Sequence, residues 1–353
     1  MRASPLARIL WAVFVLLTAY ATLYPAEGWR APGGSPFAYL TAPWPRYVTR
    51  FDVVANILGY VPYGFFAAAA LLPHLRGPAA FALAALSGAA LAASLEALQS
   101  FLPARFESLL DVLCNTLGAA IGAALGVRFA PALLGGPVGD WRQRAFLPGS
   151  LVDLGLVLVG LWLFIQLNPA TLLFGAGDLR ELIGARPASG QAPPYFIANE
   201  ALIAAVNLTA VGLLLSGLAA PGAARRLQIA ALTAAALAVK TLAFAILMQT
   251  QDVLDWLTPG AQAGILAGLA AAALLAGLPR VVRLALAAML IMAATVLVNL
   301  APPNPYLAAT LKVWQQGHFL NFNGLTRLVS VLWPFAALGY LMMLAARRPR
   351  EST

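Results

Sequence analysis

Ten apolar segments, separated by short polar stretches, constrain the fold of this chain more than any other feature. About 20 apolar residues cross the hydrocarbon of a bilayer as a helix. Only 10% of the 353 residues are charged and 61% are hydrophobic, whereas a soluble domain carries about 25% charged residues. The sequence therefore predicts an all-α polytopic membrane protein of about ten transmembrane helices. The segments cover roughly residues 8–25, 52–73, 79–100, 108–129, 151–168, 198–219, 227–249, 262–278, 281–300 and 327–346.

The charge of the loops predicts the orientation of these helices. The net charge is +9, and the basic residues lie between the apolar segments, which is typical of the positive-inside rule rather than of nucleic-acid binding. An even number of helices places both termini on the same side, which the rule predicts to be cytoplasmic. The arginine clusters assigned to that side are Arg225–Arg226, Arg280 with Arg283, and Arg347–Arg348, whereas Asp252 and Asp255 fall in a loop on the other side.

A stretch rich in glycine, proline and arginine divides the chain at residues 131–150. We interpret it as a cytoplasmic linker. The predicted organisation is then a four-helix module over residues 1–130 and a six-helix region over residues 151–353.

An octet of residues recurs in the first module. Asp52-Val-Val-Ala-Asn56-Ile-Leu-Gly59 returns as Asp111-Val-Leu-Cys-Asn115-Thr-Leu-Gly118, in register 59 residues later. The spacing i, i+4, i+7 places Asp, Asn and Gly on one stripe of each helix, and the glycines permit close approach of a neighbouring helix. Both octets open a segment that enters from the same side, so we expect a parallel repeat of helical hairpins.

The segment between the octets runs in the opposite direction and brings further polar residues to the same depth. The predicted result is one cluster of carboxylates, amides and arginines in the outer leaflet. Buried charge in a membrane is expensive and commonly marks function. The cluster comprises Asp52, Asn56, Glu96, Gln99, Arg105, Asp111 and Asn115, with Arg50 beside it.

Structural interpretations of the same residues stay open. Asp52 and Asp111 are suited to stabilising the first turns of their helices. Glu96 and Arg105 are suited to an ion pair that joins a hairpin, and buried amides often hold helices together without any other role.

Four residues of the second region are secondary candidates. Lys240 lies within an apolar segment and would act as a counter-ion or substrate contact, or would extend its charge to the membrane surface (snorkel) or simply be paired. Glu200 and Asn207 share a helix face and would extend a polar cavity, or serve as a cap and a packing amide. His318, in an outer loop, would be a general base or a solvated side chain. The sequence has no metal-ligand spacing, one cysteine and no nucleotide-binding loop, so we expect no metal and no cofactor.

The combined motifs of the first module resemble the VanZ-like family of membrane proteins, over about residues 8–130. The family takes its name from a membrane protein associated with teicoplanin resistance. The resemblance implies a bacterial inner-membrane protein of the cell envelope, near lipids or lipid-linked glycan precursors, and no particular reaction. The motifs are Asp52-x3-Asn56-x5-Pro62-x-Gly64, Ser94-x-Glu96-x2-Gln99 and Arg105-x5-Asp111-x3-Asn115-x2-Gly118.

Three functions are compatible with this sequence. In the first, the polar cluster binds or handles a lipid or lipid-linked precursor: Arg105 and Arg50 bind phosphate or carboxylate, and the amides bind other head-group atoms. In the second, the protein is an enzyme that acts on a lipid head group, with Glu96, Asp111 or Asp52 as acid and base. In the third, the protein is a structural partner of another membrane protein.

The predicted orientation can be tested at the loop between the third and fourth segments. A cysteine at position 108, introduced as Ser108→Cys with Cys114→Ser, should react with an impermeant maleimide from the periplasmic side. Labelling that requires permeabilisation of the inner membrane would reject this orientation.

Overall fold

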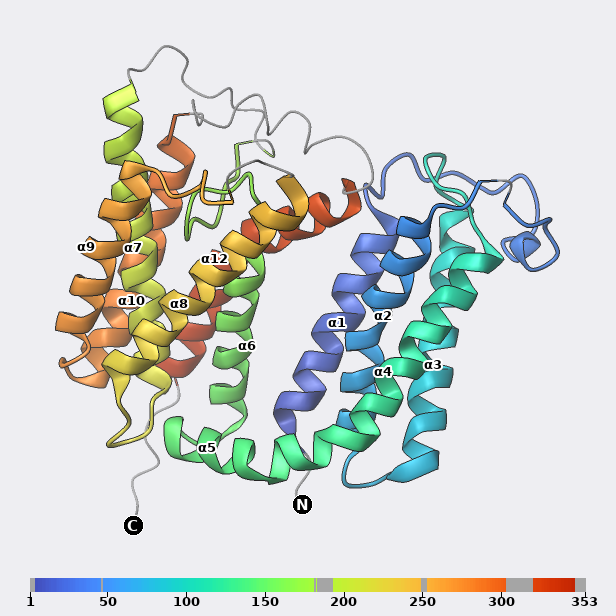
Figure 1. Cartoon of the computed structure of the whole chain (residues 1–353), viewed down its shortest axis with the longest axis horizontal. Helices are drawn as coiled ribbons and strands as arrows, with labels where there is room; N and C mark the ends of the chain where they lie inside the picture. Colours follow the sequence, from blue (N-terminus) through green and yellow to red (C-terminus); the bar gives the residue numbers. More distant parts are fainter. Residues whose placement is uncertain are drawn as a thin grey trace. The chain divides into compact units, whose positions relative to one another are not determined.

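The computed structural model describes residues 4–45, 47–180, 182, 193–248, 253–302 and 320–346. The chain divides into two compact units, Met1–Gln143 and Arg144–Thr353. Its secondary structure over the described residues is helical, without a β-strand (Figure 1). The all-α prediction is therefore confirmed.

The first unit contains four long helices. Their bounds are α1 (Pro5–Leu23), α2 (Arg50–Leu71), α3 (Gly77–Gln99) and α4 (Leu109–Gly135). A 3-10 turn, η1 (Ala38–Leu40), lies between α1 and α2, and a short helix, α5 (Pro137–Ala145), follows α4. Residues 131–150, interpreted as a linker, thus contain the end of α4, α5 and the first residue of α6.

The second unit contains the remaining apolar helices. They are α6 (Ser150–Ile165), α7 (Pro193–Leu218), α8 (Arg225–Ala243), which continues as the π-helical turn η2 (Phe244–Met248), α9 (Pro259–Leu275), α10 (Arg280–Leu300) and α12 (Leu320–Ala346).

Eight of the described helices are long and apolar enough to cross a membrane, and α6 and α9 are shorter apolar helices. Each of the ten predicted segments corresponds to one of these helices. With 16 residues, α6 reaches only about 24 Å. The chain beyond it, residues 166–180, is irregular but largely buried. Irregular backbone at membrane depth is tolerated where protein covers it, and this burial satisfies that condition.

Glycine determines how closely α2 and α4 pack. The two helices run in the same direction (Figure 1). A Cβ atom at Gly118 would lie 2.1 Å from the Ile57 carbonyl oxygen, and one at Gly64 would lie 2.0 Å from the Ala119 carbonyl oxygen. Only glycine fits at these distances, so the contact is made by backbone against backbone.

The opposite stripe of α4 carries large apolar side chains. Leu113, Leu117, Ile121 and Leu125 recur every fourth residue and are exposed. This pattern is expected of a helix that packs against protein on its glycine face and against lipid on the other.

The expectation that both octet glycines lie at a helix contact is right for Gly118 and wrong for Gly59. A Cβ atom at Gly59 would meet nothing within 4 Å. The α2 residues against which the α4 glycines pack are Ile57, Val61 and Phe65, spaced every fourth residue, and position 59 is off this stripe. The two octets share their residues but do not pack in the same way.

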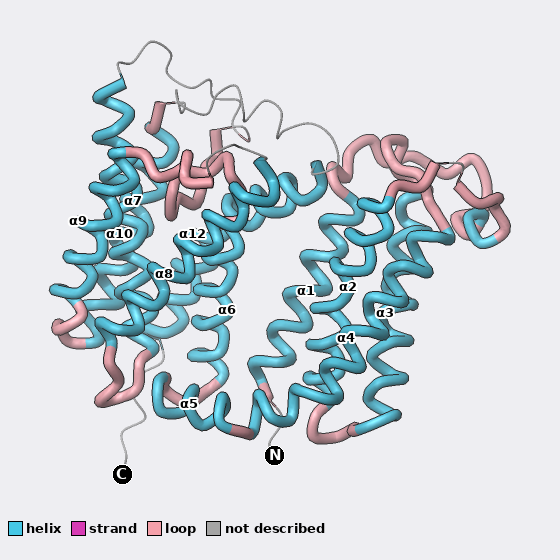
Figure 2. Tube along the Cα trace, viewed as in Figure 1, coloured by secondary structure: helices cyan, strands magenta, loops and turns pink. Residues whose placement is uncertain are grey.

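The loops that precede α2 and α4 lie at the same end of the first unit (Figure 2). Tyr39 of η1 is buried and donates a hydrogen bond of 3.0 Å from its hydroxyl to the Ala93 carbonyl oxygen of α3. The Arg30 amide donates to the Phe101 carbonyl oxygen at 2.9 Å. The long first loop is therefore fastened over the end of α3.

The glycine contact generates a paired prediction. Gly118→Ala should lower the free energy of unfolding of the detergent-solubilised protein by about 1–3 kcal/mol, because the added methyl group cannot fit against a backbone carbonyl. Gly59→Ala should be neutral or stabilising by up to about 1 kcal/mol, since alanine favours helix more than glycine does. Equal losses of melting temperature in the two variants would contradict the assigned contact.

Candidate functional site

The two octets meet through a hydrogen bond between their polar residues. The Asn56 side-chain amide of α2 donates to an Asp111 carboxylate oxygen of α4 at 2.8 Å. Gly118 packs against Ile57, the residue after Asn56, and this close contact brings the helices near enough for the bond. We call the polar residues along this contact, Asp52, Asn56, Tyr60, Asp111 and Asn115, the α2–α4 seam.

Asp52 lies at the exposed end of the seam and takes part in capping α2. The Thr49 hydroxyl accepts a hydrogen bond of 3.1 Å from the Asp52 amide and donates one of 2.6 Å to its carboxylate. Asp52 also interacts electrostatically with Asp111. The capping role that the sequence left open is present, and it holds the carboxylate at the exposed end of the seam. Arg50, the first residue of α2, is exposed.

Glu96 and Gln99 make contacts that fasten the ends of neighbouring helices to α3. The buried Glu96 carboxylate accepts a hydrogen bond of 2.8 Å from the Ser108 amide at the start of α4. The buried Gln99 amide donates to the Thr22 carbonyl oxygen of α1 at 2.8 Å. Glu96 also interacts electrostatically with Asp111, so its carboxylate lies close to the seam.

Arg105 belongs to the same set of fastening contacts. Its guanidinium donates to the Tyr24 carbonyl oxygen just beyond α1. Burial lowers the pKa of Arg105, and the nearby Glu96 carboxylate opposes that shift. We call Glu96, Gln99 and Arg105 the α3 staple, because each joins α3 or its loop to another helix end.

Two buried polar atoms of the seam have no hydrogen-bond partner in the part of the chain that the structure describes. They are the Asn115 side-chain oxygen and the Tyr60 hydroxyl, in side chains that are only 4% and 3% exposed. Each lies four residues, or one helical turn, beyond a member of the Asn56–Asp111 pair. An unsatisfied buried polar group costs about 1–3 kcal/mol.

Sequence reasoning missed the tyrosines and the capping residues. Tyr60 interacts electrostatically with Glu96 and packs its ring 6.0 Å from that of Tyr63. Its spacing of four residues from Asn56 was the signal that could have found it. Burial raises the pKa of Tyr39, to which the Glu96 charge adds. Tyr39 lies in the long loop between α1 and α2, where no helical spacing relates it to the other polar residues.

The secondary candidates Lys240 and Glu200 form a buried group inside the second unit. The Lys240 ammonium donates to the carbonyl oxygens of Asn168 and Thr171, both at 2.8 Å, and lies 5.7 Å from the centre of the Phe244 ring. The Glu200 carboxylate accepts a hydrogen bond from the Thr258 hydroxyl and interacts electrostatically with Lys240.

Asn207 and His318 add little to this group. The Asn207 amide donates to the Ile203 carbonyl oxygen of its own helix at 2.9 Å. His318 lies outside the described residues. Within the described ranges, no group of three or more His, Cys, Asp or Glu side chains is placed to hold a metal ion.

Residues 9–130 match the family model described as VanZ/LLP1. The matched range contains both octets, the α3 staple and the loops above them, whereas α5 to α12 lie outside it. No curated protein and no solved structure matches this chain. The resemblance predicted from the motifs is confirmed over this range.

The α3 staple generates a prediction on the role of the Glu96 charge. Glu96→Gln should remain stable because its side-chain oxygen still accepts the Ser108 amide. Glu96→Leu should lose about 1–3 kcal/mol, since that amide would be left without a partner. Melting temperatures in detergent measure both. Ser94→Ala is the control, because the Ser94 hydroxyl is exposed and bonds within its own helix. A loss in Glu96→Gln as large as that in Glu96→Leu would show that the charge is required.

Proposed function

Since residues 9–130 are a VanZ-like module, we propose that this module binds the head group of a membrane lipid or lipid-linked envelope precursor at the α2–α4 seam. The unsatisfied Asn115 oxygen and Tyr60 hydroxyl carry the proposal. In hydrocarbon, solvent is not present to satisfy such groups. A polar head group that enters the seam would supply their partners.

The chemistry of the seam favours a head group rich in hydrogen-bond donors. Its carboxylates and the Asn115 oxygen are acceptors, so they suit hydroxyl or amino groups. The exposed Arg50, two residues from Asp52, supplies a positive charge for a phosphate. A glycosyl phosphate on a lipid carrier combines both features. We therefore favour a lipid-linked glycan precursor over an uncharged lipid.

In this proposal the two groups of polar residues have different roles. Asn56, Asp111 and Asn115 contact the head group, with Asp52 at the entrance. The α3 staple holds the helix ends that surround the seam. The Arg105 guanidinium binds the chain after α1, so Arg50 replaces it as the phosphate contact.

One observation favours an enzyme as the second candidate function. Asp111 interacts electrostatically with both Asp52 and Glu96. Neighbouring carboxylates that share a proton can act as general acid and base. However, the Asp111 and Glu96 carboxylates already accept hydrogen bonds from Asn56 and Ser108. Their bonded state favours binding over proton transfer.

The proposal predicts the behaviour of Asn115→Leu. The variant should fold at least as stably as the wild type, because it removes a buried unsatisfied oxygen. Its affinity for the co-purifying head group should fall about fivefold to tenfold, as expected for one lost hydrogen bond. Native mass spectrometry of the purified protein measures the retained lipids. Glycopeptide and detergent sensitivity of the host measures the effect in the cell.

Asn207→Leu is the matched control for this experiment. Asn207 is also a buried helical asparagine, but its amide bonds within its own helix in the second unit. This change should leave the lipid profile unaltered. The proposal fails if Asn115→Leu retains the wild-type lipids and phenotype. Turnover of an added lipid that Asp111→Asn abolishes, with binding intact, would establish the enzyme instead.

A further inference from the structure

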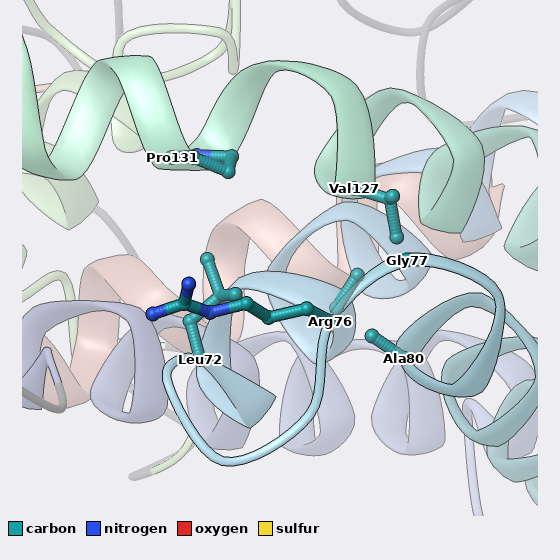
Figure 3. Close-up of a pocket in the computed structure, with 7 residues that line it drawn as sticks. Leu72, Arg76, Gly77, Ala80, Val127 and Pro131 are labelled. Atoms are coloured by element: carbon teal, nitrogen blue, oxygen red, sulfur yellow. The ribbon is translucent and has the colours of Figure 1, made fainter. Parts of the chain in front are cut away.

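A small pocket lies at the end of the first unit remote from the seam. It has a volume of about 180 Å³ and is bounded by the turn between α2 and α3 and by α4. Figure 3 shows Val127 and Pro131 on one side and Leu72, Arg76 and Ala80 on the other. Apart from Arg76, the lining side chains are apolar. The pocket therefore presents hydrocarbon surface beside one cation.

Arg76 is available to bind an anion. It is exposed and makes no hydrogen bond or ion pair with any residue that the structure describes. The exposed Arg8 lies in the first turn of α1, and α1 begins at the same end of this unit (Figure 1). Arg76 is also the residue that precedes the first turn of α3, where the helix dipole favours negative charge. The charge surrounding the pocket is thus positive.

From this geometry we propose that the pocket binds one anionic glycerophospholipid of the bilayer. Part of an acyl chain packs against Leu72, Ala80, Val127 and Pro131, and the phosphate pairs with the Arg76 guanidinium. A free phosphate would leave the apolar lining uncovered. A zwitterionic lipid has an ammonium group that the surrounding arginines repel. Charge and lining together favour the anionic lipid.

The pocket and the seam lie toward opposite ends of α2 and α4. Asn56 and Leu72 are 16 residues apart along α2 and its C-cap, or about 24 Å. Tyr60 and Asn115, the deepest residues of the seam, are each 12 residues, or about 18 Å, from Leu72 and Val127. One head group cannot occupy both places. The lipid bound at Arg76 is therefore a different molecule from any ligand of the seam, and this inference does not depend on the proposed function.

Native mass spectrometry of the full chain, with phosphatidylglycerol or phosphatidylcholine added, tests the inference. The wild type should retain phosphatidylglycerol more strongly than phosphatidylcholine. Arg76→Gln should weaken phosphatidylglycerol binding about tenfold or more, because it removes a charge-assisted hydrogen bond. Val127→Phe, which fills the pocket from α4 and keeps Arg76, should weaken it as well.

Arg128→Gln is the matched control. Arg128 is exposed at the same end, but its guanidinium lies 5.2 Å from the centre of the Phe129 ring and does not line the pocket. This variant should bind phosphatidylglycerol like the wild type. Equal retention of the two lipids, unchanged binding by Arg76→Gln, or an equal loss in Arg128→Gln would each overturn the proposal. Unchanged binding by Val127→Phe would overturn the seating of the acyl chain in the pocket.

Discussion

The backbone contact between α2 and α4 is the interaction on which the first unit depends. In a bilayer, apolar side chains gain little by leaving lipid, so helices associate through close packing and hydrogen bonds. Gly64, Gly118 and Gly122 allow that packing, since a Cβ atom at each would lie 2.0–2.1 Å from a carbonyl oxygen of the other helix. The Asn56–Asp111 bond forms because the backbones are already close. Polar contact is thus a consequence of the glycine stripe.

The polar cluster predicted from the sequence separates into two parts with different energetics. In the α3 staple, Glu96, Gln99 and Arg105 each bond to the backbone of a neighbouring segment. Such contacts satisfy orphan groups at helix ends and define where the helices begin and end. In the seam, Asn115 and Tyr60 retain unsatisfied atoms. The staple side chains are each fixed by a bond to backbone, whereas the Asn115 oxygen and the Tyr60 hydroxyl accept and donate no hydrogen bond among the described residues. In the proposed function a ligand supplies those partners.

The sequence was sufficient for the helices and for the approach of the two octets. Apolar length identifies a span without reference to its neighbours, and chain direction alone places Asn56 and Asp111 at one depth. The sequence-based predictions fail where several residues fit the same spacing and only the packing of the helices determines which of them makes the contact. Gly59 matches Gly118 in the repeat, yet the crossing of the helices uses Gly64 on α2. Tyr39 was not predicted because its burial depends on how a long loop folds over α3.

The second unit shows why a buried charge alone does not identify a site. Lys240 is 2% exposed inside an apolar helix, a position that commonly signals function. Its ammonium, however, donates hydrogen bonds to two backbone carbonyl oxygens of the irregular segment after α6, and backbone groups at membrane depth must be satisfied within the protein. Lys240 of α8 therefore anchors the segment that follows the short helix α6. The hydrogen bonds of the Lys240 ammonium give this residue a structural role. The Asn115 side-chain oxygen has no hydrogen bond of this kind among the described residues.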